Sequence, residues 1–433
     1  MKKKGLVTLA VFAFAAVFSQ IPNSTNTKRT VGLTQQTKQP LAGACQVNEY
    51  LPMLKGKRVA IFANNTSTIG NTHLVDTLQK LDINIVKIFG PEHGFRGTAS
   101  AGEKIDNYTD KQTGIPVISL YGKKRKPSQE DLADVDILLF DIQDVGVRFY
   151  TYISSLQEFI ESAIEFNKPL IILDRPNPNG YYVDGPVLDT TFKSFVGMQP
   201  VPVVYGMTIG EYGNFLIGED LLKKSATASV AAPATTGSKK DGSGFNLAVI
   251  KCQNYTHNST YSLPERPSPN LPDDKSVFWY PSTCFFEGTV LSEGRGTDHP
   301  FQVFGHPSLP KTMYAFTPVS NTGAKNPKLE NMLCYGWNLA ETPMTQNQNT
   351  RLQLKYLLDA YKLFPDKENF FIVPKKDTVK PTDIFFNKLA GNAELIQQIK
   401  DGKSEQEIRA SWEPQLSDFK KKRKKYLLYP DTM

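Results

Sequence analysis

The stretch DILLFDIQDVGVRFY, residues 136–150, indicates the fold, because its apolar run Ile137–Phe140 turns polar abruptly at Asp141. A short continuous apolar run is typical of a strand that is buried on both faces. Residues 152–166, which follow, have the apolar spacing of an amphipathic helix. The pattern predicts a strand, a polar loop and a helix in succession, which is the repeating unit of a parallel sheet.

Two other apolar runs change character in the same way. PLIIL at 169–173 is followed by DRPNPNG at 174–180, and INIVKIF at 83–89 is followed by GPEHGFRG at 90–97. The loops at the carboxyl ends of parallel strands meet at one edge of the sheet, where ligands bind. We therefore predict an α/β fold, with a Rossmann-like parallel-sheet domain and a second, smaller α+β C-terminal domain.

The loop at 90–97 concentrates residue types that move protons or hold anions. Glycine and proline set its backbone, while Glu92, His93 and Arg96 supply an acid, an imidazole and a guanidinium. A site at the end of a strand needs such groups. The alternative is a capped turn with a surface salt bridge, because an isolated motif is weak support for a site.

The first strand, Arg58–Ala63, lacks the glycine pattern of a nucleotide site. It leads into NNTSTIG at 64–70, and neither GxGxxG nor GxxxxGK[ST] occurs in the sequence. We therefore expect no nucleotide cofactor. Asn65, Thr66 and Ser67 offer neutral hydrogen-bonding groups for the hydroxyls or amides of a substrate. Alternatively, they form an Asx or Ser/Thr turn before a helix at 72–80.

The N-terminus is typical of an exported protein. Met1–Lys4 is a charged region and Leu6–Phe18 an apolar one that is too short for a membrane anchor. We predict a signal peptide at 1–22 and a disordered polar spacer at 23–44. The protein is then periplasmic or secreted. LAGAC at 41–45 lies too far from the apolar region to serve as a lipoprotein box.

The charge balance does not favour a nucleic-acid partner. The chain carries a net charge of +7, but residues 1–44 hold six basic residues and no acidic one, which leaves 44 basic and 43 acidic residues beyond them. A nearly neutral mature protein lacks the basic surface of a nucleic-acid binder. The cluster KKKRKK at 420–425 is interpreted as the C-terminal turn or solvated face of a last helix.

Cysteine and histidine spacing does not predict a metal site. The four cysteines show no CxxC pair, the five histidines form no HExxH motif, and we expect neither a metal nor another cofactor. Export permits disulfides, but the sequence does not choose a pairing. These residues are Cys45, Cys252, Cys284, Cys334, His73, His93, His257, His299 and His306.

The length of the chain and the order of its strand and helix patterns predict two domains. We place a Rossmann-like catalytic domain at 45–262, with an exposed polar connection near 223–244, and a C-terminal domain that closes the cleft at 263–433. The second begins with the proline-dense, rigid segment 263–272. It continues with FFEGTVLSEGRGT at 285–297, a second glycine-spaced group of charges, and ends with helical patterns at 352–364 and 384–426.

Ten ordered blocks resemble a known family. They are PEHGFRG (91–97), AGE (101–103), TGIPVISLYG (113–122), DIQDVGVRFYTYI (141–153), LDRPNPNG (173–180), DGP (184–186), SFVG (194–197), YGMTIGE (205–211), RPSPNLP (266–272) and FEGTVLSEGRGT (286–297). Together they are similar to the bacterial exo-acting β-N-acetylmuramidases, long carried as a domain of unknown function, over nearly the whole mature chain. The C-terminal residues 411–430 also resemble the family's ending.

The resemblance implies a Rossmann-like domain, a smaller C-terminal domain and a cleft between them. It also implies the release of N-acetylmuramic acid from the non-reducing end of peptidoglycan fragments. Glu92 stands where the family's proposed catalytic glutamate lies. Val290 departs from the polar residue that many relatives carry there.

Glycoside cleavage needs an acid for the leaving oxygen and a second group as nucleophile or base. Glu92 is our candidate acid, and His93 can tune it. The candidates for the second role are Asp141, Asp144, Glu287 and Glu293, and we include Asp144 with Glu92 and His93 in the catalytic set. Alternatively, the acetamido group of the sugar supplies the nucleophile. The stereochemical outcome stays open.

Substrate recognition calls for a cation, because muramic acid carries a lactyl carboxylate that a bidentate guanidinium suits. Arg96 is the first candidate for this role, because its loop also carries Glu92. Tyr121, Phe149 and Tyr150 can stack on sugar faces, although aromatic residues there are often core. The predicted substrate-binding set is Asn65, Arg96, Asp141, Gln143, Arg148, Tyr150, Asp174, Arg175, Asn177, Asn270, Glu287, Glu293 and Arg295.

Two other function classes remain open. A non-catalytic periplasmic protein that binds sugar or peptidoglycan would use the same cleft without needing Glu92. An esterase or amidase is the other alternative, although the sequence lacks a GxSxG elbow and a cysteine–histidine signature.

Overall fold

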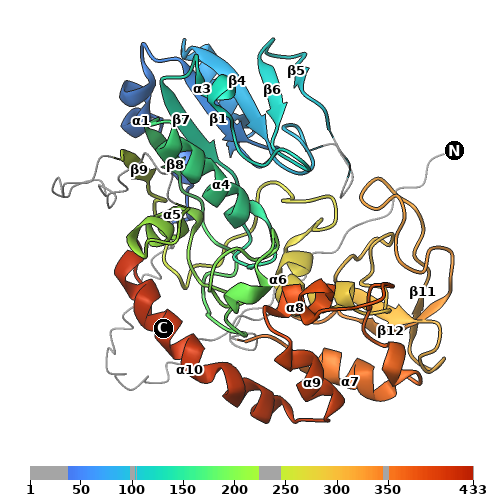
Figure 1. Ribbon diagram of the computed structural model, residues 1–433. Helices are drawn as coiled ribbons and strands as arrows, with labels where there is room; N and C mark the ends of the chain where they lie inside the picture. Colours follow the sequence, from blue (N-terminus) through green and yellow to red (C-terminus); the bar gives the residue numbers. More distant parts are fainter. Residues whose placement is uncertain (1–37, 98–102, 104, 224–244, 345–350, 433) are drawn as a thin grey trace, which may run out of the picture. The chain divides into compact units, whose positions relative to one another are not determined.

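A seven-stranded sheet organises the first part of the chain (Figure 1). The computed structural model describes residues 38–97, 103, 105–223, 245–344 and 351–432. The strand order is β5-β6-β4-β1-β7-β8-β9, in which only β5 runs antiparallel to its neighbour. The strands are β1 Val59–Ala63, β4 Ile85–Gly90, β5 Tyr108–Thr109, β6 Pro116–Ser119, β7 Ile137–Asp141, β8 Leu170–Leu173 and β9 Leu247–Ile250. The predicted, mainly parallel sheet is confirmed.

Helices cover both faces of this sheet. Alternate residues of β1 show the arrangement, since Ile61 packs with the side of α1 and α2 while Phe62 packs with the side of α3, α4 and α5. This two-sided burial explains why the central strands are apolar throughout. The helices are α1 Val47–Leu54, α2 Leu74–Lys80, α3 Gln129–Leu132, α4 Tyr152–Glu165 and α5 Ile209–Gly218, and a short hairpin joins β2 Thr68–Ile69 to β3 Thr72–His73.

The strand order places a switch point at β1. The chain runs outward from β1 through β4 to β6 on one side, and from β7 through β8 to β9 on the other. The loops that follow β4 and β7 therefore diverge on either side of β1, which opens a crevice at the carboxyl edge of the sheet. This edge is where the polar loops of the sequence are expected to meet.

The later part of the chain builds a second, smaller set of elements. A three-stranded antiparallel sheet, in the order β10-β12-β11, lies among helices (Figure 1). Its elements are α6 Asp274–Thr283, β10 Val303–His306, β11 Tyr314–Phe316, β12 Cys334–Asn338, α7 Lys355–Leu363, α8 Phe385–Ala390, α9 Glu394–Lys400 and α10 Glu405–Arg423. Short 3-10 helices are η1 Gly43–Cys45, η2 Thr190–Phe192, η3 Cys284–Gly288, η5 Lys367–Asn369, η6 Pro381–Asp383 and η7 Lys424–Tyr426.

One apolar cluster joins the two sets of elements. It contains Phe62 of β1, Phe159 of α4, Trp279 of α6, Phe304 of β10 and Trp412 of α10. The described residues from Gln39 onward accordingly form one compact unit. The division at residues 262 and 263 stays a prediction, as do the signal peptide and the spacer, which lie almost entirely outside the described residues.

The basic cluster near the C-terminus lies where the sequence places it. Lys420, Lys421 and Lys422 occupy the last turn of α10, where cations favour the helix dipole. Arg423 is different, since it is buried and its guanidinium donates to the carbonyl of Gly206. All four cysteines are free, and no described helix is long and apolar enough to cross a membrane.

Candidate active site

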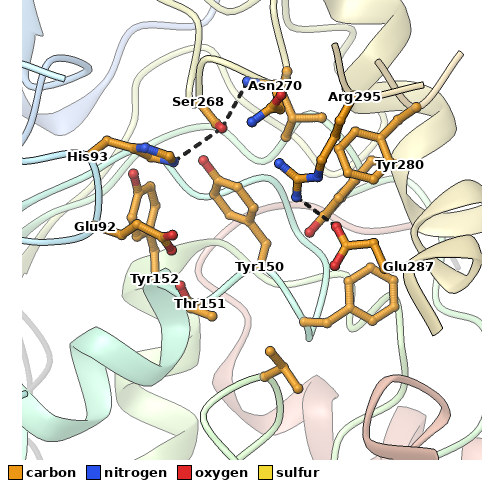
Figure 2. A pocket seen from close by; sticks show the side chains of 14 residues that line it. Glu92, His93, Tyr150, Thr151, Tyr152, Ser268, Asn270, Tyr280, Glu287 and Arg295 are labelled. Atoms are coloured by element: carbon orange, nitrogen blue, oxygen red, sulfur yellow. Dashed lines mark hydrogen bonds and ion pairs between the residues drawn. The ribbon is translucent and has the colours of Figure 1, made fainter. Parts of the chain in front are cut away.

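A pocket with a volume of about 170 Å³ lies at the carboxyl edge of the large sheet (Figure 2). The loops after β4 and β7 form one side of it, and residues 268–301 form the other. Five aromatic side chains and seven charged or polar ones line it, and the combination of aromatic surface with placed polar groups is typical of a ligand site. The lining residues are Glu92, His93, Phe149, Tyr150, Thr151, Tyr152, Val196, Ser268, Asn270, Leu271, Tyr280, Glu287, Arg295 and Phe301.

A sharp turn after β4 brings Glu92 and His93 to the pocket. His93 has φ +68° and Gly94 φ +76°, so both lie in the left-handed region, which is unusual for a residue with a side chain. The turn is anchored by Phe95, which is fully buried in the core. The Tyr121 hydroxyl donates a 2.9 Å hydrogen bond to Oε1 of Glu92. The carboxylate is thus held at a fixed place on the wall.

The proline-dense segment 263–272 packs on this turn. Nε2 of His93 lies 3.3 Å from Oγ of Ser268, and the Tyr150 hydroxyl donates to the carbonyl of Pro267 at 2.7 Å. Asn270 donates through its amide to the carbonyl of Gly323 at 2.8 Å. These bonds connect both sheet loops to the later part of the chain, so the pocket wall is fixed from two sides.

On the opposite wall, Glu287 and Arg295 belong to a network of four charges, whose other two members, Glu293 and Lys328, do not line the pocket. Nη2 of Arg295 donates to Oε1 of Glu287 at 2.7 Å, and its Nε lies 3.4 Å from Glu293. Lys328 pairs with the other oxygen of Glu293 at 2.9 Å. The guanidinium also lies over the ring of Phe301, 5.0 Å from its centroid. Figure 2 shows Glu92 and the pair of Arg295 and Glu287 on different sides of the pocket.

The network keeps two of its members, Arg295 and Glu293, charged despite their burial. Burial opposes the charge on Arg295, but Glu287 and Glu293 outweigh it and hold the pKa of the guanidinium above its usual value. Burial likewise opposes the charge on Glu293, but Lys328 and Arg295 hold its pKa below the usual value. Arg295 and Glu293 therefore stay charged near neutral pH.

Three other arginines of the predicted set lie outside the pocket lining, each with its own partners. Arg96 binds Asp76 and Asp110. The second, Arg175, is buried and pairs with Asp141 at 2.6 Å. Arg148 is fully buried, and its terminal nitrogens donate to four carbonyl oxygens, those of Pro186, Val201, Leu389 and Ala390. The position of Arg96 on the Glu92 loop is therefore no guide to where its side chain points.

Two aspartates after β7 and β8 are buried in the framework below the pocket. Asp144 accepts from the Gly146 amide at 2.6 Å and from the Tyr205 hydroxyl, and burial raises its pKa to about 7. Asp174 accepts from the Thr208 and Tyr429 hydroxyls, and burial raises its pKa to about 6. Neither carboxyl lines the pocket, and the catalytic role given to Asp144 stays a prediction.

The predicted amides also serve the framework. Gln143 donates to the carbonyls of Asp144 and Pro176, while the Asn177 side chain donates to that of Met207 at 2.8 Å. The loop after β1 folds into the turn that we considered as an alternative, because Asn64 accepts from the amide of Thr66. Asn65 donates to the carbonyl of Arg266 at 2.9 Å instead of lining the pocket.

The sequence therefore predicted some of the residues that line the pocket but not all of them. The predicted residues brought together at the pocket are Glu92, His93, Tyr150, Asn270, Glu287 and Arg295, and Phe149, which the sequence analysis considered for stacking on a sugar, lies with them. The residues missed are Thr151, Tyr152, Val196, Ser268, Leu271, Tyr280 and Phe301. Ser268 and Tyr152 lie within blocks that carried the family resemblance. Tyr280 and Phe301 carry no local signal, because only the fold brings α6 and the loop before β10 to the sheet edge.

Fold and site together define a Rossmann-like α/β protein with an acid-bearing, aromatic-lined pocket at its sheet edge. Residues 59–275 match the family model "Exo-beta-N-acetylmuramidase NamZ, N-terminal", and residues 278–429 match its C-terminal counterpart. The chain belongs to the NamZ exo-β-N-acetylmuramidase family.

Relatives support this assignment in sequence and structure. The chain is 36% identical over 407 residues to the peptidoglycan β-N-acetylmuramidase NamZ of Bacillus subtilis (strain 168), which covers 88% of this chain and 89% of the relative. A DUF1343 family protein from Bacteroides fragilis NCTC 9343 is similar with a TM-score of 0.77 and 42% identity, over 91% of this chain and all of that one. A second has a TM-score of 0.72 and 28% identity, over 90% and 99%.

Proposed function

We propose that this protein is an exo-acting β-N-acetylmuramidase that releases N-acetylmuramic acid from the non-reducing end of peptidoglycan fragments. The observation that carries the proposal is the position of Glu92, a carboxylate held by Tyr121 on the wall of an aromatic-lined pocket. Aromatic walls suit the apolar faces of a sugar ring, and a positioned carboxylic acid suits protonation of the leaving oxygen. The exo mode of cleavage is supported by the two family models that the chain matches, which describe exo-acting enzymes.

For the second catalytic group, the pocket supports a narrower choice than the sequence did. Of the candidates Asp141, Asp144, Glu287 and Glu293, Glu287 alone lines the pocket. Glu287 acts as nucleophile, as base, or as a group that orients the acetamido oxygen of the sugar. The first step under this proposal is proton transfer from Glu92 to the glycosidic oxygen as the bond to the anomeric carbon breaks.

The test is incubation of the pure protein with a muramyl-glucosamine disaccharide, followed by mass spectrometry of the products. We expect free N-acetylmuramic acid and N-acetylglucosamine from the wild type, and their release at least about a hundredfold more slowly from Glu92→Gln. Absence of turnover by the wild type, with binding intact, would instead support the non-catalytic binding protein. Release of acetate or peptide without sugar would support the esterase or amidase.

The exo mode has its own test, which is digestion of a long glycan chain. A pocket that accepts one terminal sugar gives monosaccharide from the first time point. Oligosaccharides that appear before the monosaccharide would contradict exo cleavage.

We also propose that the enzyme acts outside the cytoplasm. The charged and apolar N-terminal segments, Met1–Lys4 and Leu6–Phe18, support export. N-terminal sequencing of the protein from the periplasmic or secreted fraction tests this, with a start near residue 23 expected. An intact Met1 in that fraction, or retention in the cytoplasm, would contradict it.

A further inference from the structure

We infer that Arg295 binds the lactyl carboxylate of muramic acid and thereby distinguishes muramides from glucosaminides. This inference rests on the proposed function, because it assigns a residue to one group of the proposed substrate. N-acetylmuramic acid differs from N-acetylglucosamine by the lactyl ether on carbon 3, so a site selective for muramides has to recognise that group. A planar guanidinium matches a carboxylate in charge and shape.

The composition of the pocket singles out Arg295. Among the described lining residues it is the only lysine or arginine. The three other candidates are occupied elsewhere, as Arg96 pairs with Asp76 and Asp110, and Arg175 pairs with Asp141. Arg148 bonds four backbone carbonyls and is fully buried. The structure therefore brings one cation to the place where a substrate carboxylate would enter.

The guanidinium is held in place while one of its edges stays open. Glu287 bonds Nη2, Glu293 faces Nε, and the ring of Phe301 lies against the guanidinium plane. Within the described part of the chain no group bonds Nη1. Figure 2 shows the guanidinium pointing toward the centre of the pocket, on the side where Tyr150 lies. A group fixed in this way loses little side-chain entropy when it binds a ligand.

The charge balance of this wall permits a further anion. Arg295 and Lys328 carry two positive charges, which Glu287 and Glu293 match with two negative ones. An incoming carboxylate thus meets a wall without net negative charge and an open N–H edge. If Glu287 were alone on this wall, it would repel the lactyl group.

The position of Arg295 relative to Glu92 fits the sugar. The acid has to reach the oxygen on carbon 1, while the lactyl group leaves the ring at carbon 3. These two atoms lie at different edges of a pyranose ring, and Glu92 and Arg295 lie on different sides of the pocket. Phe149 and Tyr150 pack edge-on against Tyr280, with ring centroids 5.4 and 5.9 Å from it, so a sugar ring would lie against this aromatic group, with Glu92 to one side and Arg295 to the other.

The experiment combines changes in the enzyme with changes in the substrate. Arg295→Lys and wild type are assayed on aryl glycosides of N-acetylmuramic acid, of its lactyl methylamide, and of N-acetylglucosamine. Loss of the bidentate geometry should lower kcat/KM on the free acid by about ten- to a hundredfold, while turnover of the methylamide and the glucosaminide changes only a few-fold. Arg96→Lys is the matched control, since this arginine lies outside the pocket, and should leave the ratio between the substrates unchanged.

The outcomes separate the inference from the proposed function. A wild type that cleaves none of the glycosides overturns both. Wild-type cleavage of the free acid with equal losses on all three substrates in Arg295→Lys, or a change in selectivity in Arg96→Lys, overturns the inference alone. If Arg295→Lys does not fold, Arg295→Gln and the wild-type preference for acid over methylamide decide the question, and a wild type indifferent to that change overturns the inference.

Discussion

Two loops at the same edge of the sheet use similar residue types for different purposes. The loop after β4 turns Glu92 and His93 into the pocket, where a substrate can reach them. The loop after β7 buries Asp144 and Arg148, and presents Phe149, Tyr150 and Thr151 to the pocket. Since both loops follow buried strands and both carry an acid and an arginine, the type of residue does not determine its role. The difference comes from what packs on each loop.

Other segments of the chain cover Asp144 and Arg148 of the β7 loop, whereas Glu92 and His93 of the β4 loop face the pocket. Carbonyl groups of the segment 186–201 and of the end of α8 surround Arg148, and Tyr205 covers Asp144. Gly146 shows how closely this loop is packed, because its φ is +76° and an added Cβ would lie 2.2 Å from Oδ1 of Asn177. Residues that look catalytic in the sequence thus become framework when a neighbouring segment covers them.

The largest effect on activity should come from Glu92→Gln, in the loop after β4 that faces the pocket. The amide keeps the shape of the side chain but cannot donate an acidic proton, so kcat/KM on the natural disaccharide should fall about 10²- to 10⁴-fold. Thermal unfolding should be nearly unchanged. Steady-state kinetics and calorimetry measure both, and turnover within a few-fold of the wild type would remove Glu92 from the acid role.

Arg148→Met, in the loop after β7, should lower the stability of the protein rather than its activity. Four buried carbonyl oxygens lose this donor, although that of Val201 still accepts from the Leu188 amide. At about 1–3 kcal/mol for each of the other three, the free energy of unfolding should fall by about 3 kcal/mol or more. Urea unfolding measures this loss. In contrast to Glu92→Gln, the folded fraction should retain kcat, and a large fall in kcat with unchanged stability would contradict the framework role.

The pH dependence of stability in Asp144→Asn tests whether Asp144 of the β7 loop is buried and protonated. Burial raises the folded pKa of Asp144 to about 7 from 3.8, so the folded state holds a proton that the unfolded state releases. Its contribution to stability is full below about pH 4 and is lost as the pH rises through 7, by up to about 4 kcal/mol. The neutral amide lacks this loss, so stability relative to the wild type should rise from pH 4 to 8.

The measurement for Asp144 is urea unfolding of both proteins across that pH range. Asp174 has a similarly raised pKa but is present in both proteins, so its effect cancels from the difference. A difference that stays constant with pH would mean that Asp144 is not protonated in the folded protein.

The smallest effect should come from Tyr121→Phe, which removes the hydrogen bond to Glu92 but keeps the ring. A lost hydrogen bond of about 0.5–1.5 kcal/mol corresponds to a two- to tenfold fall in kcat. Because the bond acts on the carboxyl group, substrates with poor leaving groups should suffer more than aryl glycosides. Tyr108→Phe, a half-exposed residue of β5, is the matched control. Equal losses in the two variants would show that Tyr121 does not position Glu92.

The sequence predicted the fold well because its signals are local. Apolar runs such as 137–140 and the amphipathic segment 152–166 became β7 and α4 almost residue for residue. The helical pattern predicted at 384–426 became three helices, α8, α9 and α10, and the basic residues 420–422 lie in the last turn of α10 as expected. The period of an apolar pattern and the length of an apolar run are visible in the sequence, whatever other segment packs against them.

The site was harder to predict because it depends on contacts between distant segments. Asp141, Asp144 and Glu92 are alike in sequence as acids after apolar strands, but their surroundings come from residues far away in the chain. Arg175 neutralises Asp141, Tyr205 covers Asp144, and the segment 263–272 leaves Glu92 facing a pocket. Burial of a polar side chain is a tertiary property, which composition and spacing do not encode.

The apolar cluster that joins the two sets of elements has a consequence for how sugars enter and leave. The boundary between the two family models, at residues 275–278, falls inside α6 Asp274–Thr283, where Trp279 belongs to that cluster. A hinge motion that separated the two sets of elements would expose the apolar cluster to water, at a free-energy cost of about 25 cal/mol for each Å² exposed. We therefore expect the exchange of substrate and product to proceed by motions of the loops and side chains around the pocket, on a faster timescale than domain opening.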